Sequence, residues 1–266
     1  MSGILDLYYW EPNTFHLKPL IMLKEMQVDF TDHYYDPVNF EQLAPGFPQS
    51  RESRHNQEWE GPLLVCGDTV MCGSFFMLEF IAEANGGTEL YPTDPYSRYQ
   101  IQEWGRVSGT ALGIGVSALG CARYLAPVLM KMDQNLLHAS LDKVEPVERR
   151  SRWLEFIDGS LDRSRQDMLH SRLGRVLRQI EDRLSTAAWL TDKGYSIADI
   201  DTYSMIWTLP ELTPDLVNGK NTPGIMDYLG RITSRPAVQS AFALSRSGRP
   251  QECFVPGIEP SRWLGL

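Results

Sequence analysis

The apolar and polar positions in the first third of the chain predict a mixed α/β segment. Strands are indicated where β-branched and aromatic residues alternate with polar ones, and a helix is indicated by the spacing of apolar residues from Phe15 onward. The Gly67-Asp68 dipeptide predicts a hairpin turn, and Ser74 precedes a further apolar helix. The predicted strands are Ile4–Tyr9, Val28–Tyr35, Leu63–Cys66 and Thr69–Met71. The expected element order is therefore βαβ followed by ββα.

Beyond residue 95 the strand pattern disappears and helical periodicity takes over. Helices separated by Pro or Gly are expected at about 95–125, 127–140, 146–185, 196–209 and 223–243. A mixed segment followed by a helical one indicates two domains. We therefore predict an α+β protein with a first domain at 1–87, a linker at 88–94 and an all-helical domain at 95–266. The Pro- and Gly-rich tail contains Phe254 and Trp263 and is expected to pack down.

The charge and composition narrow the class of partner. The 266 residues include 34 acidic and 25 basic ones, a formal net charge of -9, which argues against nucleic-acid and anionic-membrane binding. No segment is expected to reach the roughly 18 apolar residues of a membrane span, and the N-terminus lacks signal-peptide character. The four cysteines form no C-x-x-C pair, which disfavours a metal site. These features predict a cytoplasmic protein with reduced thiols.

Four motifs in order connect the chain to a known family. They are Gly61-Pro62-Leu63-Leu64 before the hairpin, Leu90 to Pro95 at the start of the helical part, Tyr195 to Ile200, and Asn221 to Val238. In the third, Ser196 and Asp199 fit a helix capping box and are taken as structural. Together these motifs resemble the glutathione transferase superfamily from about residue 5 to 245. The resemblance implies a thioredoxin-like N-terminal domain and an all-helical C-terminal one.

Within that superfamily, two short stretches and one insert are similar to the bacterial glutathione-dependent β-aryl etherases. They are Phe15 to Leu20, Tyr35 to Gln42, and the helical residues 106–155. The resemblance implies an enzyme that cleaves β-aryl ether bonds of lignin-derived aromatics, in which a glutathione thiolate displaces a phenolate and leaves a glutathione thioether. It also implies an aromatic small-molecule substrate and a homodimer, or a heterodimer with a related chain.

The resemblance implies where glutathione, the co-substrate, would be held. Gly61, a cis Pro62 and Leu63 would pair with its cysteinyl backbone like an added strand. The γ-glutamyl carboxylate would lie at the helix start formed by Gly73 and Ser74, with Ser74 also capping the helix. The glycyl carboxylate would be bound by His55, with Arg51 or Arg54 as alternatives.

The thiol needs a donor at the start of the first helix. Asn13 and Thr14 are the candidate catalytic residues, with an equal expectation that they are simple turn residues. His16 fits a packed or solvated helix residue better than a base. Trp10, Phe15 and Tyr124 could line the acceptor side, although aromatic residues at such positions more often belong to the core.

Two departures from the family pattern indicate an altered glutathione site. Gly73 stands where the family usually has Asp or Glu, and Phe15-His16 stands where the etherases carry Asn-Ser. Three functions therefore remain open from the sequence. They are an active β-etherase, a catalytically weakened partner subunit of a heterodimer, and a glutathione transferase or peroxidase for other electrophiles.

Overall fold

The computed structural model describes residues 5–49, 60–159 and 161–257, so the predicted ligand His55 lies outside the described residues. Its sheet has the strand order β2-β1-β3-β4. The strands are β1 (Leu5–Tyr9), β2 (Phe30–Tyr34), β3 (Leu63–Cys66) and β4 (Thr69–Met71). β1 pairs in parallel with β2, and the other two pairings are antiparallel. The predicted strands are thus confirmed with small changes at their ends.

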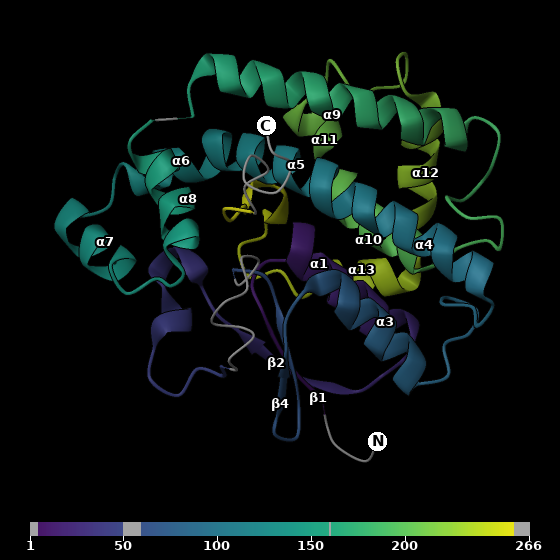
Figure 1. Cartoon of the computed structure of the whole chain (residues 1–266), viewed down its shortest axis with the longest axis horizontal. Coiled ribbons are helices and arrows are strands. Elements are labelled where there is room, and N and C mark those ends of the chain that lie inside the picture. Colours follow the sequence, from purple (N-terminus) through teal and green to yellow (C-terminus); the bar gives the residue numbers. More distant parts are fainter. Residues whose placement is uncertain (1–4, 50–59, 160, 258–266) are drawn as a thin grey trace.

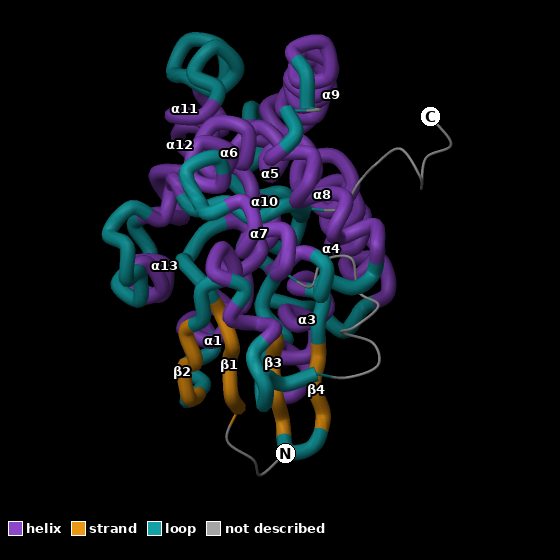
Figure 2. Tube along the Cα trace, turned by 90° about the vertical axis from the view of Figure 1, so that its left-hand side faces the viewer, coloured by secondary structure: helices purple, strands orange, loops and turns teal. Residues whose placement is uncertain are grey.

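Two helices pack beside this sheet and complete the predicted βαβ-ββα order. They are α1 (Thr14–Glu25) and α3 (Ser74–Ala84), and they contact each other. Every residue of α1 from Thr14 to Leu23 is buried. This happens because α1 also contacts two helices of the C-terminal part, α10 (Ile197–Ile206) and α13 (Pro236–Phe242). The strands occupy one end of the molecule and the helical part the other (Figures 1 and 2). The predicted domain boundaries themselves stay a prediction.

The helical part starts with one long helix, in which α-helical and π-helical turns alternate. It runs through α4 (Pro95–Val107), η3 (Ser108–Leu112), α5 (Gly113–Gly120), η4 (Cys121–Leu125) and α6 (Ala126–Leu129), with η3 and η4 in π geometry. The predicted break near Pro127 is wrong. The π turn just before this proline has already shifted the regular hydrogen-bond ladder, so its missing N–H is tolerated.

By length and composition this helix, Pro95–Leu129, could cross a membrane. The prediction that no segment qualifies is therefore wrong on that test, because the isoleucine, valine, leucine and alanine residues raise the hydropathy of α5. However, 61% of the most apolar window is buried inside the protein, as in the core helix of a globular fold. The apolar character of the helix is accounted for by packing.

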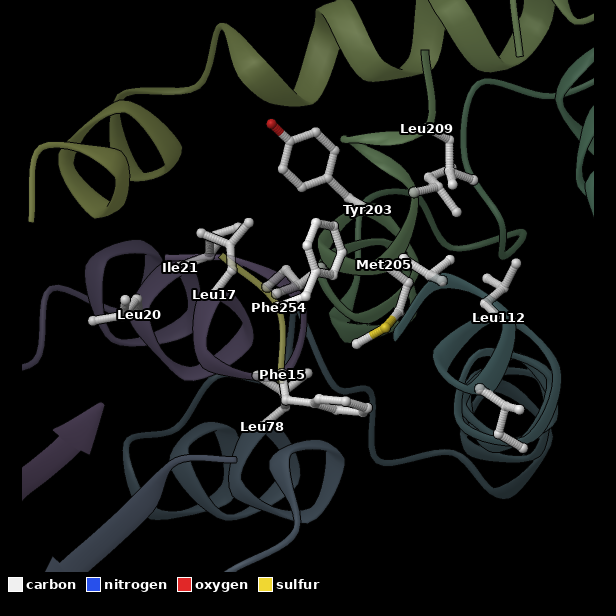
Figure 3. Close-up of a cluster of buried hydrophobic side chains, with 14 of the residues drawn as sticks. Phe15, Leu17, Leu20, Ile21, Leu78, Leu112, Tyr203, Met205, Leu209 and Phe254 are labelled. Atoms are coloured by element: carbon white, nitrogen blue, oxygen red, sulfur yellow. The ribbon is translucent and has the colours of Figure 1, made fainter. Parts of the chain in front are cut away.

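The remaining helices are α7 (Gln134–Leu141), α8 (Val147–Ile157), α9 (Arg163–Leu184), α11 (Leu209–Leu212) and α12 (Pro223–Thr233), with short 3-10 turns η1 (Pro37–Asn39), η2 (Glu41–Leu43) and η5 (Pro250–Glu252). The helix predicted at 146–185 is divided, because Gly159 has a positive φ after α8 and Asp162 caps α9. α10 begins with the predicted capping box of Ser196 and Asp199. One apolar core joins both halves, and Figure 3 shows Phe254 of the tail among residues of α1 and α10.

Candidate functional site

Asn13 caps α1 and links three parts of the chain. Its Oδ1 accepts hydrogen bonds from the backbone N–H of Thr14 at 2.9 Å and from Nε1 of Trp207 at 3.0 Å. Its Nδ2 donates to the backbone carbonyl of Cys253 at 2.9 Å. The side chain is buried, so the amide is held by the protein on both its ends. The bond to the tail uses one of the two Nδ2 protons, and the second has no acceptor among the described residues.

Thr14 has an unusual backbone conformation at the first position of α1. Its φ is 43°, a left-handed value that is a real outlier for a β-branched residue. Strain of this kind clusters at functional sites. The Thr14 hydroxyl makes no hydrogen bond with the described residues, and it lies at a helix N-terminus, where the macrodipole favours negative charge. Both predicted catalytic residues therefore keep a donor without a partner among the described residues, the Thr14 hydroxyl and the second Nδ2 proton of Asn13.

His16 is a fully buried, neutral side chain in the first turn of α1. Its Nδ1 accepts from the backbone N–H of Trp10 at 3.0 Å, so its Nε2 carries the proton and donates to the carbonyl of Glu60 at 2.7 Å. Burial lowers the pKa of His16 to about 4. The packed interpretation of His16 is therefore confirmed, and the imidazole has no proton-accepting nitrogen left for a substrate.

The segment Gly61–Leu63 is buried and leads into β3. The peptide bond before Pro62 is trans, so the expectation of a cis bond is wrong; among the described residues the cis bond is Glu145-Pro146. The Gly61 carbonyl is held from inside, since Tyr35 donates its hydroxyl proton to it at 2.9 Å. The backbone thus keeps the trans form that X-Pro bonds generally prefer.

Gly73 and Ser74 form the start of α3, as the resemblance implies. Gly73 is the N-cap and has a φ of 88°, which glycine adopts without the cost another residue would meet. Ser74 is the first helical residue, and no side chain among the described residues caps this end, so the capping role predicted for Ser74 is wrong. The reason is its position: a serine inside the first turn cannot bond back to the amides that an N-cap reaches. The uncapped amides can donate hydrogen bonds to an anion.

The aromatic residues proposed for the acceptor side are packed by the protein itself. Trp10 and Phe15 are buried. Tyr124 lies parallel to Phe254, with ring centroids 5.9 Å apart and planes at 5°. Phe254 in turn lies directly on the backbone of Gly120. These positions fit the alternative that they belong to the core.

A buried polar cluster that the sequence reasoning missed lies just before Gly61. The Glu60 carboxylate accepts from Nε of Arg149 at 2.5 Å, Nε1 of Trp153 at 3.1 Å and Nε2 of Gln42 at 2.7 Å. Arg149 and Trp153 lie on α8, 89 and 93 positions away in the sequence. No local pattern could connect residues at that separation, since charged residues are expected at the surface unless paired.

Comparison with known proteins adds to this geometry. Residues 143–236 match the family profile "Glutathione S-transferase, C-terminal domain". Protein LigF of Sphingobium sp. (strain NBRC 103272 / SYK-6) is 28% identical over 249 residues, which cover 91% of this chain and 94% of LigF. The crystal structure of Beta-etherase LigF from Sphingobium sp. strain SYK-6 is similar with a TM-score of 0.83, covering 91% of this chain and 99% of that one.

Other solved structures are similar in fold at lower scores. A glutathione transferase from Pseudomonas putida, with one glutathione disulfide bound per subunit, has 22% identity and a TM-score of 0.66, covering 91% of this chain and 92% of its own. A glutathione transferase from Burkholderia graminis, with two glutathione molecules bound per subunit, has 22% identity and a TM-score of 0.68, covering 92% and 89%.

Proposed function

Because this chain has the glutathione transferase fold, with the C-terminal domain of that family at residues 143–236, we propose that it is a glutathione-dependent β-etherase. The observation that carries the proposal is the likeness to LigF, whose structure matches this chain at a TM-score of 0.83 against 0.66 and 0.68 for the two glutathione transferases above. The substrate would be a lignin-derived aromatic β-aryl ether.

The chemistry is a substitution at carbon. The sulfur of the glutathione thiolate attacks the β-carbon that bears the aryloxy group, and the C–S bond forms as the C–O bond breaks. The electron pair leaves with the phenolate, which takes a proton from solvent. The products are a glutathione thioether and a phenol, and no oxidant or reductant is consumed.

The site residues divide the work of holding glutathione. The uncapped amides and hydroxyl at Ser74 would bind the γ-glutamyl carboxylate, next to Gly73. Gly61, Pro62 and Leu63 would face the cysteinyl backbone, and the predicted glycyl ligand is His55. The thiolate would lie at the N-terminus of α1, where Thr14 offers a free hydroxyl and Asn13 an amide shared with the tail.

The partner-subunit alternative is favoured by a specific observation. The Asn13 amide is bonded to Trp207 and Cys253, and His16 is bonded on both ring nitrogens. A chain with such a site would have low activity by itself. It would instead support a catalytically competent relative in a heterodimer. We place either form, homodimer or heterodimer, in the cytoplasm.

The test is calorimetric titration of glutathione into the purified chain, followed by turnover of a synthetic β-O-4 ether. We expect a Kd of about 1 mM or tighter and release of the phenol and the thioether, detected by mass spectrometry. No binding would contradict the self-sufficient enzyme and favour the partner-subunit function. Turnover of a generic aromatic halide without turnover of the ether would favour a transferase for other electrophiles.

The role of Thr14 gives a prediction. Thr14→Val keeps the β-branched shape and removes the hydroxyl, so kcat for the ether should fall by about tenfold or more while the glutathione Kd changes little. Thr110→Val is the matched control, because the Thr110 hydroxyl bonds a helix carbonyl on the exposed side of η3. An unchanged kcat in Thr14→Val would show that Thr14 does not act on the thiol.

A further inference from the structure

Glu60 is a buried carboxylate that ties two helical elements to the entrance of β3. Its Oε1 accepts from Arg149 and Trp153 of α8, at 2.5 and 3.1 Å, and its Oε2 accepts from Gln42 of η2 at 2.7 Å. Glu60 and Arg149 are each 1% exposed. Three donors therefore fix the carboxylate, two of them from the helical part of the chain.

The backbone carbonyl of Glu60 is also held by hydrogen bonds. The Glu60 carbonyl accepts from His16 Nε2 at 2.7 Å and from the Tyr35 hydroxyl at 3.4 Å, and the Tyr35 hydroxyl also donates to the Gly61 carbonyl at 2.9 Å. The chain then continues through Gly61 and Pro62 into Leu63, which pairs with Tyr8 of β1. Both the side chain and the main chain of Glu60 are thus fixed immediately before Gly61.

We propose that the bonds from α8 to Glu60 form a clamp that positions Gly61–Leu63 for glutathione. Glu60, Arg149 and Trp153 are positioning residues in this proposal, since they act through the backbone of the next three residues. The proposal rests on the proposed function, because it deepens the role of that same segment. It makes glutathione affinity depend on a helix of the opposite half of the molecule.

The electrostatics favour a positioning role over a simple gain in stability. A buried ion pair loses the hydration of both charges, so its net contribution to stability is small, whereas its geometry is demanding. Removing one partner leaves the other charge buried without compensation. The Trp153 ring is also packed against Phe40, with centroids 5.1 Å apart, which fixes the direction of its N–H. The hydrogen bonds to the Glu60 carboxylate can therefore all form with its backbone in one position.

The clearest variant is Trp153→Phe, which removes one N–H from the Glu60 carboxylate and keeps an aromatic ring against Phe40. We expect the Kd and KM for glutathione to rise by about tenfold, with kcat and the KM for the ether within about twofold of the wild type. Trp104→Phe is the matched control. The Trp104 indole donates to the Leu190 carbonyl at 2.9 Å, a contact within the helical part, so its loss should leave glutathione binding within about twofold.

Glu60→Gln is a second variant that keeps the shape and removes the charge. The Oε1 of Gln42 is buried without a hydrogen bond, so the Gln42 amide can turn and accept from the new side-chain amide. The variant can thus retain a bond to η2 while it loses the ionic bond to Arg149. We expect a loss of glutathione affinity at least as large as in Trp153→Phe.

Amide hydrogen exchange of a peptide covering residues 60–64 measures positioning without any ligand. We expect it to exchange faster in both variants than in the wild type, while a peptide from α10 stays unchanged. If the wild type binds no glutathione, the proposed function fails. The exchange data still test whether the bonds to Glu60 order residues 60–64. The clamp proposal is overturned if the folded variants keep the wild-type glutathione Kd or if only kcat falls. If the wild type does not bind glutathione, the proposal is overturned by unchanged hydrogen exchange at residues 60–64.

Discussion

At the scale of single residues, burial decides which groups near α1 can carry out chemistry. His16 is neutral because its ring is enclosed and both nitrogens are bonded, and burial lowers its pKa to about 4. In the unfolded chain the same group has its ordinary value near 6.5. Between these two pH values the unfolded state binds a proton that the folded state does not. The contribution of His16 to stability is therefore complete above pH 6.5 and is lost as the pH falls toward 4.

This linkage predicts a difference between the wild type and His16→Gln. The glutamine amide can still donate toward the Glu60 carbonyl but has no proton to gain. The wild type should lose about 3 kcal/mol more of its unfolding free energy than the variant between pH 7 and pH 4, as measured by urea denaturation at several pH values. Parallel pH curves for the two proteins would contradict the assignment of a low pKa to His16.

At the scale of elements, the long helix from α4 to α6 has one face of small residues that receives the C-terminal tail. The α carbon of Gly257 lies against Ser117, and the Phe254 ring lies against Gly120. A Cβ on Gly120 would come within 2.3 Å of Phe254 Cδ1, and Phe254 is itself buried. On another face of the same helix, a Cβ on Gly115 would meet Leu173 at 3.7 Å, an ordinary contact.

Two alanine substitutions on α5 should therefore change the free energy of unfolding in different directions. Gly120→Ala should lower the free energy of unfolding by about 1–3 kcal/mol through overpacking. Gly115→Ala should leave it unchanged or raise it by up to about 1 kcal/mol, because alanine favours a helix. Urea unfolding of both variants measures the difference. Equal effects would show that the tail is not packed on the Gly120 face.

At the scale of the whole molecule, a second buried ion pair joins the two halves. Lys18 of α1 contacts Asp201 of α10 with Nζ 2.6 Å from Oδ1, and both side chains are almost fully buried. Neither carboxylate oxygen of Asp201 has a further hydrogen bond among the described residues. Lys18 is thus the group that compensates this charge at the boundary between the halves.

Lys18→Met should be strongly destabilising because it leaves Asp201 buried and unpaired. We expect a loss of about 3–5 kcal/mol, with much of it recovered in the double variant Lys18→Met/Asp201→Leu. Glu25→Gln is the control at another contact between the halves. Its partner Arg235 is about one third exposed, so the loss should be less than half as large. Urea denaturation of the wild type, Lys18→Met, Asp201→Leu and the double variant gives the coupling energy, and additive effects would contradict it.

The apolar pattern was enough to predict the local elements, whereas the candidate site residues came from the family resemblance and stay a prediction. The strands, the two helices beside the sheet and the capping box of Ser196 and Asp199 follow from residues close in sequence, where periodicity and turn chemistry act directly. The start of α3 at Ser74 was also found this way. The predicted helix break near Pro127 is wrong, because the π turn before this proline lets the helix continue to Leu129.

Local sequence was thus enough to specify the order of elements and the fold class, since each element depends on neighbours within a few residues. Tertiary structure alone decided what the candidate residues contact. It joined Asn13 to Trp207 and Cys253, and it joined Glu60 to Arg149, pairs separated by 89 to 240 positions. Contacts over such separations are set by how whole helices pack, and burial then fixes which hydroxyls, amides and charges remain free for a ligand.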